Sequence, residues 1–223
     1  MKVNGKLVRG IIFDLDGTIL DSASIWKEVD EAFFRKRNIE MPIDYGEEIG
    51  HIGLDKAATY TINRFHLNEK KEDIIKEWKD GVLDYYAHKV TLKPHVKEFL
   101  LFLKNNNVPF CVATANDEDC YKSALINNGI YDLFDFILEV NNFKNGKDKP
   151  DIFYACIEKL GSTVSTTIVF EDLPLPLSTA KQANIMCVGV KDLSYNDDIE
   201  SIKKELADIY IEDFDELYKY ISD

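Results

Sequence analysis

The chain has 223 residues, of which 45% are hydrophobic and 30% are charged. Its formal net charge of −13 excludes the broad basic face that nucleic-acid binding requires. No apolar run approaches the roughly 18 residues of a membrane-spanning helix, so we expect neither a nucleic-acid nor a membrane partner.

The cysteine spacing and the N-terminal sequence indicate which cellular compartment to expect. Cys111, Cys120, Cys156 and Cys187 form no CxxC pair and have no zinc-site spacing with the four histidines. The N-terminal stretch MKVNGKLVRGIIFD has no long apolar segment and no small-residue cleavage site, so it is not typical of a signal peptide. We therefore predict reduced thiols in a cytoplasmic protein, with a monomer as the default expectation.

Short apolar runs alternate with helical patterns along most of the chain. The runs are continuous rather than alternating, as expected for strands that are buried on both faces. They lie at 8–14, 108–114, 134–140, 166–172, 185–190 and 207–211. Helical patterns follow at 94–106, 117–128, 150–160, 175–183 and 213–221. This order predicts an α/β fold with a doubly wound, Rossmann-like parallel sheet.

One long segment interrupts this alternation. Between residues 22 and 90 there is no convincing strand, and helical periodicity dominates instead. Almost seventy helical residues directly after the first strand indicate an inserted helical domain. We therefore predict a core domain made of residues 1–21 and 91–223, and a helical domain made of residues 22–90.

Polar side chains follow three of the predicted strands. Ligands of open α/β sheets bind at the carboxyl ends of the strands. In this chain those ends read Asp14-Leu-Asp16-Gly-Thr, then Thr114-Ala-Asn116, then Glu171-Asp172. The sequence thus places acidic and hydrogen-bonding groups at one edge of the sheet.

The Asp14-Leu15-Asp16-Gly17 segment suits a divalent cation. Its two carboxylates can approach one site because Gly17 permits the chain to turn. Two nearby carboxylates repel, so one of them is protonated or a cation lies between them. Carboxylate oxygens suit Mg²⁺, which also accepts phosphate oxygens and water. A solvated, aspartate-rich turn is the alternative interpretation.

With these residues in view, the chain resembles the haloacid dehalogenase superfamily, and within it the beta-phosphoglucomutase-like branch. IIFDLDGT closely resembles the first motif of that superfamily. Thr114 matches the second motif, Lys149 in KDKPDIF matches the third-motif lysine, and Glu171-Asp172 in IVFED matches the acidic fourth motif. The inserted helical segment matches the family's helical cap domain, which closes over the site and selects the substrate.

The resemblance implies roles for the acidic residues. Asp14 would attack phosphorus and form an aspartyl-phosphate. Asp16 would protonate the leaving group and later deprotonate the hydrolytic water. Asp14, Asp16 through its backbone carbonyl, Glu171 and Asp172 would hold Mg²⁺.

The resemblance also implies which residues contact the phosphoryl group. Thr114 and the backbone around Ala115 and Asn116 would donate hydrogen bonds to it. Lys149 would neutralise charge on the nucleophile and on the phosphoryl oxygens. Taken alone, Lys149 could equally be a solvated loop lysine, and Thr114 could cap the next helix.

The fourth motif departs from the family pattern. Leu173 and Pro176 stand where relatives usually have serine and glycine, and Asn184 stands where they usually have glycine. Proline is tolerated in the first helical turn, so a helix at 175–183 can still form. Asparagine tolerates the left-handed conformation of a helix cap.

Together these features predict a Mg²⁺-dependent phosphatase acting on a small phosphorylated metabolite. Sugar-phosphate mutases of this branch have a histidine shortly after the first motif, and Trp26 occupies the approximate position here. A mutase therefore stays an alternative, as does a non-catalytic phosphate-binding protein. The sequence does not identify the phosphomonoester.

Overall fold

A six-stranded parallel sheet forms the centre of the molecule. The computed structural model describes residues 1–222. The strand order is β5 (Ile137–Glu139), β4 (Phe110–Thr114), β3 (Gly10–Phe13), β6 (Thr167–Glu171), β7 (Met186–Val190) and β8 (Ile209–Ile211). In the register of the central three strands, Ile12 lies between Cys111 and Val169. The predicted parallel sheet of the doubly wound type is confirmed.

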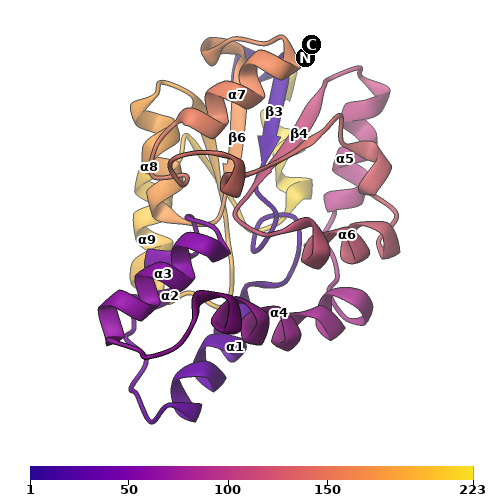
Figure 1. The fold of residues 1–223 in the computed structure, drawn as a ribbon. Helices are drawn as coiled ribbons and strands as arrows, with labels where there is room; N and C mark the ends of the chain where they lie inside the picture. Colours follow the sequence, from indigo (N-terminus) through magenta and orange to yellow (C-terminus); the bar gives the residue numbers. More distant parts are fainter. Residues whose placement is uncertain (223) are drawn as a thin grey trace.

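Helices cover both faces of this sheet (Figure 1). Their bounds are α5 (Val96–Asn105), α6 (Glu118–Asn127), α7 (Asp151–Leu160), α8 (Pro174–Gln182) and α9 (Asp197–Leu206). Successive strand side chains point to opposite faces, so Phe13 packs in the cluster beneath α5 and α6. Ile12 packs in the cluster beneath α7 and α8. Strands β3, β4, β6 and β7 are fully buried, which accounts for their continuous apolar sequences.

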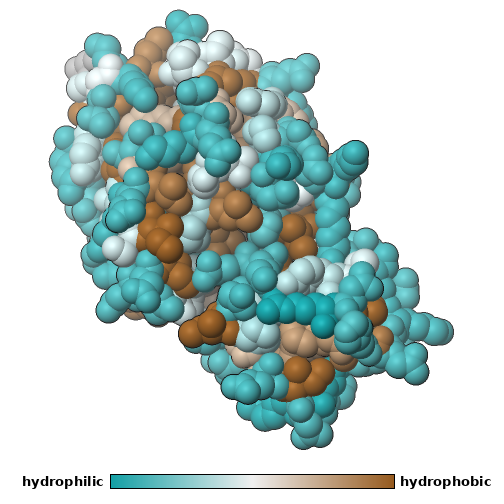
Figure 2. Space-filling model, turned by 90° about the vertical axis from the view of Figure 1, so that its left-hand side faces the viewer, coloured by the Kyte–Doolittle hydropathy of each residue, from teal (hydrophilic) through white to brown (hydrophobic). Residues whose placement is uncertain are grey.

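Four further helices lie beyond the strands' carboxyl ends, at the lower end of Figure 1. They are α1 (Ala23–Lys36), α2 (Tyr45–Ile49), α3 (Leu54–Phe65) and α4 (Lys71–His88). Their amphipathic sequences bury one stripe each in a separate cluster that contains Phe33, Phe34, Tyr45 and Trp78. Figure 2 shows this part as a smaller lobe beside the larger one, with hydrophobic atoms near the junction.

The two connections between the lobes run side by side. Leu20 and Leu92 form an antiparallel bridge. The Asp21 N–H donates to the Thr91 carbonyl at 2.9 Å, and the Lys93 N–H donates to the Ile19 carbonyl at 2.9 Å. The helical segment therefore leaves and rejoins the sheet at one point, next to the loop that carries Asp16.

Several elements differ from the sequence-based expectations. Helix α9 was not predicted, because its sequence is mostly charged. The segment expected as a helix at 213–221 is a 3-10 helix, η4 (Phe214–Tyr220). A small antiparallel sheet of β1 (Lys2–Val3), β2 (Lys6–Leu7) and β9 (Ile221–Ser222) was also not foreseen. The remaining short 3-10 turns are η1 (Tyr131–Leu133), η2 (Val140–Asn142) and η3 (Val164–Thr166).

Two simpler expectations can be compared directly with the structure. All four cysteines are free thiols, and all four are buried. Within residues 1–222, no helix combines the length and apolar character needed to cross a membrane.

Candidate active site

The loop after β3 brings two aspartates to the centre of the sheet edge. The Asp14 N–H donates to the Phe170 carbonyl at 3.0 Å, which fixes Asp14 directly after the strand. Gly17 follows with φ +84°, a left-handed conformation that favours glycine. A Cβ on Gly17 would lie 2.2 Å from Asp172 Oδ2. Glycine is thus needed both for the turn and for the close approach of the second acidic loop.

Three buried carboxylates gather at this point. Oxygens of Asp14, Glu171 and Asp172 lie within 4.8 Å of one another. Glu171 is the last residue of β6, the strand that neighbours β3, and Asp172 follows it directly. Asp172 Oδ1 accepts a hydrogen bond from the Thr18 hydroxyl at 3.2 Å, whereas its buried Oδ2 has no hydrogen-bond partner among residues 1–222.

The electrostatics of this cluster favour a cation. Burial raises the pKa of Asp172 well above its usual value, and the charges of Asp14 and Glu171 raise it further. Burial also raises the pKa of Glu171 despite the opposing effect of Lys147. The unpaired Asp172 oxygen and the oxygen-only ligand set fit a hard divalent ion such as Mg²⁺.

The lysine that contacts Asp14 is Lys147, and this corrects the expectation that Lys149 would do so. Lys147 is 2% exposed, and its Nζ donates to Asp14 Oδ1 and, at 2.7 Å, to Glu171 Oε1. Burial lowers the pKa of Lys147, but the two carboxylates more than offset this effect and hold it above its usual value. Lys149 is exposed to solvent.

The local backbone explains the difference between the two lysines. The Lys147 N–H donates to the His51 carbonyl at 2.9 Å, which holds the turn against the helical lobe. Gly146 permits this approach, since a Cβ there would lie 2.6 Å from the His51 carbonyl oxygen. Lys149 comes one residue before Pro150, where the chain turns outward into α7. The Gly146-Lys147 pair was the sequence signal that could have identified the inward lysine.

Asp16 is surrounded by hydrogen-bond donors from three elements. Its Oδ1 accepts from the Ser22 hydroxyl at 2.6 Å and from the Tyr86 hydroxyl, and its Oδ2 accepts from Asn116 Nδ2 at 2.9 Å. Burial raises the pKa of Asp16, and these donors oppose the rise. The Tyr86 oxygen in turn accepts from Trp26 Nε1 at 2.7 Å. Sequence analysis did not identify Ser22 or Tyr86, which join the site from the helical segment.

We expect Tyr86→Phe to lower kcat for phosphate release about tenfold, because it removes a hydrogen bond to a buried carboxyl. That hydrogen bond lowers the pKa of Asp16, so its loss should raise that pKa and move the alkaline limb of the pH profile upward. Tyr85→Phe is the matched control, since Tyr85 lies outside the Asp16 contacts. An unchanged kcat and pH profile in Tyr86→Phe would contradict this role.

The end of β4 supplies neutral hydrogen-bonding groups. Thr114 and Asn116 are buried, and the Asn116 N–H donates to Thr114 Oγ1 at 2.9 Å. Thr114 Oγ1 therefore accepts from the protein and keeps its own O–H for another acceptor. Ala115 lies between them and lines the cavity described below. The structure thus brings the Thr114–Asn116 segment to the same sheet edge as the carboxylates.

The unusual residues of the fourth motif leave both of its acidic residues, Glu171 and Asp172, in place. Helix α8 begins at Pro174, so Pro174 and Pro176 both lie in its first turn, as expected. Glu171 Oε2 accepts from the backbone N–H groups of Asp172 at 3.0 Å and Leu173 at 3.2 Å. Asn184 has φ +59°, which is the predicted left-handed conformation after the helix.

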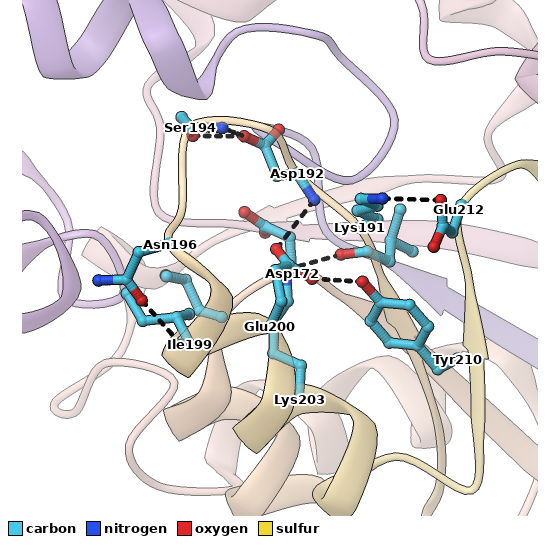
Figure 3. A network of polar contacts seen from close by, with 12 residues as sticks. Asp172, Lys191, Asp192, Ser194, Asn196, Ile199, Glu200, Lys203, Tyr210 and Glu212 are labelled. Carbon is cyan, nitrogen blue, oxygen red and sulfur yellow. Dashed lines mark hydrogen bonds and ion pairs between the residues drawn. The ribbon is translucent and has the colours of Figure 1, made fainter.

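A loop after β7 lies on the other side of Asp172, and buried polar contacts fix it (Figure 3). Asp192 Oδ1 accepts from the Ser194 N–H at 2.8 Å. Glu200 accepts from the Asp192 N–H at 3.3 Å and pairs with Lys203 at 2.6 Å. Helix α9, which sequence analysis missed, therefore positions the loop that carries Ser194 and Tyr195.

A cavity of about 320 Å³ opens between this loop and the helical lobe. At one end it is lined by Asp16, Ala115 and Asn116. The helical lobe contributes residues that include Asp30 and Trp78. The volume is in the range of small-molecule binding sites.

Asp30 should destabilise the fold at neutral pH. It is 6% exposed, and burial raises its pKa to about 8. A raised carboxyl pKa imposes a cost that is absent below the unfolded-state pKa, grows as the pH rises, and is complete above the folded-state pKa.

We therefore expect Asp30→Asn to raise the free energy of unfolding at pH 8 by about 2–4 kcal/mol. The gain should disappear toward pH 4, because both forms of the site are then uncharged. Denaturant unfolding at the two pH values measures it, with the exposed neighbour substitution Glu31→Gln as control. A gain that is equal at both pH values would contradict the electrostatic explanation.

The chain belongs to the haloacid dehalogenase-like hydrolase family, whose model matches residues 11–190. This match spans the first aspartate motif, the helical segment and the acidic loop after β6. The family resemblance drawn from the sequence is therefore confirmed.

Individual relatives agree with this assignment. The chain is 27% identical to a validoxylamine A 7′-phosphate phosphatase of Streptomyces hygroscopicus, covering 92% of this chain and 94% of the relative. It is 25% identical to the pyrophosphatase PpaX of Oceanobacillus iheyensis, covering 97% and 98%. A beta-phosphoglucomutase structure from Clostridium difficile has the same fold, with a TM-score of 0.77, 21% identity and 96% and 97% coverage.

Proposed function

We propose that the chain is a magnesium-dependent phosphatase that hydrolyses a small phosphomonoester through an aspartyl-phosphate on Asp14. The observation that carries this proposal is the pairing of Asp14 with Lys147 beside the carboxylates of Glu171 and Asp172. Family membership and the phosphatase relatives support the same reaction class.

In the first step, an Asp14 carboxylate oxygen attacks phosphorus and the bond from phosphorus to the leaving oxygen breaks. Asp16 donates its proton to that oxygen, which is consistent with a pKa raised by burial. In the second step a water attacks phosphorus, Asp16 takes the proton of that water, and the bond between phosphorus and Asp14 breaks. Inorganic phosphate leaves, and both aspartates return to their starting states.

The remaining groups stabilise the transferring phosphoryl group. Lys147 offsets negative charge on Asp14 and on the phosphoryl oxygens, the role expected of Lys149 from the sequence. The free O–H of Thr114 and the backbone near Ala115 and Asn116 can donate to those oxygens. Bound Mg²⁺, held by Asp14, Asp172, the Asp16 carbonyl and Glu171, would supply charge neutralisation between the anionic nucleophile and the anionic substrate.

The helical segment acts as the substrate-selecting domain in this proposal. Residues 22–90 form it, and residues 1–21 and 91–223 form the catalytic core. The paired connections at Leu20 and Leu92 support this division. Tyr86 reaches from α4 to Asp16, so the position of the helical lobe affects the acid-base group.

The residue near the position of the mutase histidine does not support a mutase activity. Trp26 stands near the position of the mutase histidine, and its Nε1–H is a donor that cannot accept a proton. A non-catalytic binding protein would not need the buried Lys147 pair. We propose a cytoplasmic monomer that acts on a phosphorylated metabolite, and the four unpaired thiols support a reducing compartment.

Phosphate release from a panel of phosphomonoesters tests the proposal. We expect release with Mg²⁺ and a loss of at least about a hundredfold in EDTA, because three buried carboxylates would then face the substrate without a cation. Restoring Mg²⁺ should restore the rate. Release that is insensitive to EDTA, or absent from the whole panel, would overturn the proposed function.

A further inference from the structure

Asp30 carries a buried carboxyl group that has no partner among residues 1–222. It lies on α1, it is 6% exposed, and its side chain makes no hydrogen bond and no ion pair with those residues. In the same part of the chain, the fully enclosed side-chain atoms without a hydrogen-bond partner are Trp78 Nε1 and Asp172 Oδ2. The Asp30 oxygens are therefore not fully enclosed. Because Asp30 lines the cavity between the lobes, a ligand in that cavity can reach them.

An ionised carboxylate is unfavourable at this position unless it has a partner. Burial raises the pKa of Asp30, and no positive charge within the described residues offsets that effect. Lys27 lines the same cavity, but it is exposed and forms no ion pair with Asp30. The catalytic steps described above do not use Asp30. A residue that lowers stability without an internal contact is typical of a binding site, so the expected partner is a ligand in the cavity.

The other residues that line the cavity indicate what kind of ligand fits beside Asp30. Glu47 on α2 adds a second carboxyl group, and burial raises its pKa. Apolar and aromatic side chains form much of the remaining wall, among them Trp26, Leu54 and Tyr195. Carboxylates and the faces of aromatic rings attract cations, and neither stabilises an anion. The cavity therefore favours a cation that is attached to an apolar skeleton.

The same cavity also reaches the acid-base group of the proposed reaction. Asp16 and Asn116 line one end, where the leaving group of a bound phosphomonoester would lie. Asp30 comes from the helical lobe, so it would contact the part of the leaving group that points away from phosphorus. One substrate can thus place its ester oxygen near Asp16 and a cation near Asp30.

We propose that Asp30 selects the substrate by forming an ion pair with an ammonium group on the leaving group of the phosphomonoester. This inference rests on the proposed phosphatase function and specifies the substrate class, which is the phosphate esters of amino alcohols. Asp30 takes no part in the steps that form and break bonds, so the ion pair is the same in the bound substrate and in the transition state. It should therefore act mainly on KM.

Two other classes of leaving group fit the cavity less well. A second phosphate or a carboxylate would be repelled by Asp30 and Glu47. A neutral sugar can donate a hydrogen bond to Asp30 but leaves its buried charge without a counterion. The other hydroxyl groups of the sugar would also lose their hydrogen bonds to water against the apolar walls.

Matched pairs of substrates test the proposal. Each ω-aminoalkyl phosphate with two to six carbons is compared with the n-alkyl phosphate in which a methyl group replaces the ammonium group. The series of lengths identifies the chain whose ammonium group reaches Asp30. At that length we expect kcat/KM for the amine to exceed that for its neutral partner by at least about tenfold, mainly through KM. An apolar cavity without an ionised partner would prefer the methyl group instead.

Asp30→Asn separates the ion pair from the stability of the fold. The amide keeps the shape of the carboxyl group but carries no charge, so the preference for the amine should fall to within about threefold. The same variant is expected to be more stable than the native chain at pH 8, so unfolding would not explain the loss. Glu31→Gln removes the same charge at an exposed position of the same helix and should keep the preference. A melting curve for each variant checks its folding.

The outcomes separate this inference from the proposed function. Acetyl phosphate, which has no amine, reports the phosphatase reaction alone. Equilibrium binding of the same pairs to the Asp14→Asn variant reports the cavity without turnover. Equal kcat/KM and equal affinity within every pair, a preference that Asp30→Asn leaves intact, or a preference for glucose 6-phosphate or 3-phosphoglycerate over every amine would overturn the inference. Selective binding of amines without hydrolysis of any compound would overturn the phosphatase and keep the binding site.

Discussion

The Asp14→Asn variant should lose Mg²⁺-dependent phosphate release by at least about a thousandfold. The amide is nearly the same size as the carboxylate but is not a nucleophile toward phosphorus. The neutral amide would also pair less strongly with Lys147, which holds Asp14 Oδ1 in the native chain. Initial rates of phosphate release at saturating substrate measure the loss.

A nearby aspartate provides the comparison for this variant. Asp21 lies on the same loop, but its side chain is exposed, so Asp21→Asn should keep kcat within about twofold. Acid quenching of the native enzyme during turnover should also trap phosphate on the chain, and Asp14→Asn should trap none. Residual activity within about tenfold of the native rate would refute Asp14 as the nucleophile.

Lys147→Met should lower kcat about a hundredfold to a thousandfold, whereas Lys149→Met should change it by no more than about twofold. Removing one preorganised group that stabilises developing negative charge typically costs this much. Met keeps most of the length of the Lys147 side chain but leaves Asp14 and Glu171 facing each other without their buried cation. Lys149 is exposed, so its charge is screened by solvent.

The paired variants distinguish the two lysines in a second way. Lys147→Met should also lower the free energy of unfolding in EDTA, because it breaks a buried ion pair and leaves repelling carboxylates. Mg²⁺ should recover part of that loss by binding the same carboxylates. Thermal unfolding with and without Mg²⁺ measures both effects. If Lys149→Met lost as much activity as Lys147→Met, the placement of Lys147 would not account for catalysis.

Much of the catalytic edge could be predicted because parallel strands place their carboxyl ends together. A buried strand has a continuous apolar sequence, so the residues after it, such as Asp14, Thr114 and Glu171, can be located without coordinates. The alternation of strands with helices and the long helical segment follow from the same periodicities. Helix α9 was missed because its sequence is mostly charged, with only Ile199, Ile202 and Leu206 as apolar residues.

Sequence analysis missed residues whose positions depend on the direction of a loop or on contacts between parts of the chain that are far apart in sequence. The choice between Lys147 and Lys149 is decided by a backbone contact to His51, which lies far earlier in the chain. Tyr86 meets Asp16 across 70 positions. Asp30 and Trp78 occupy one polar and one apolar position on amphipathic helices. Only the packing of residues 1–222 shows that both side chains are buried and that Trp78 Nε1 has no hydrogen-bond acceptor there.

In the proposed function, where the helical segment selects the substrate, the adjacent connections at Leu20 and Leu92 allow the part of the gene that encodes substrate selection to change separately from the part that encodes the chemistry. Because the chain leaves and returns through one antiparallel bridge, the intervening segment can be exchanged without altering the order or register of the sheet. The exchanged piece must still supply a hydroxyl to Asp16 and apolar contacts such as those of Val82 and Val90. Within those limits, a single recombination event could redirect the enzyme to another metabolite while the hydrolytic centre is inherited intact.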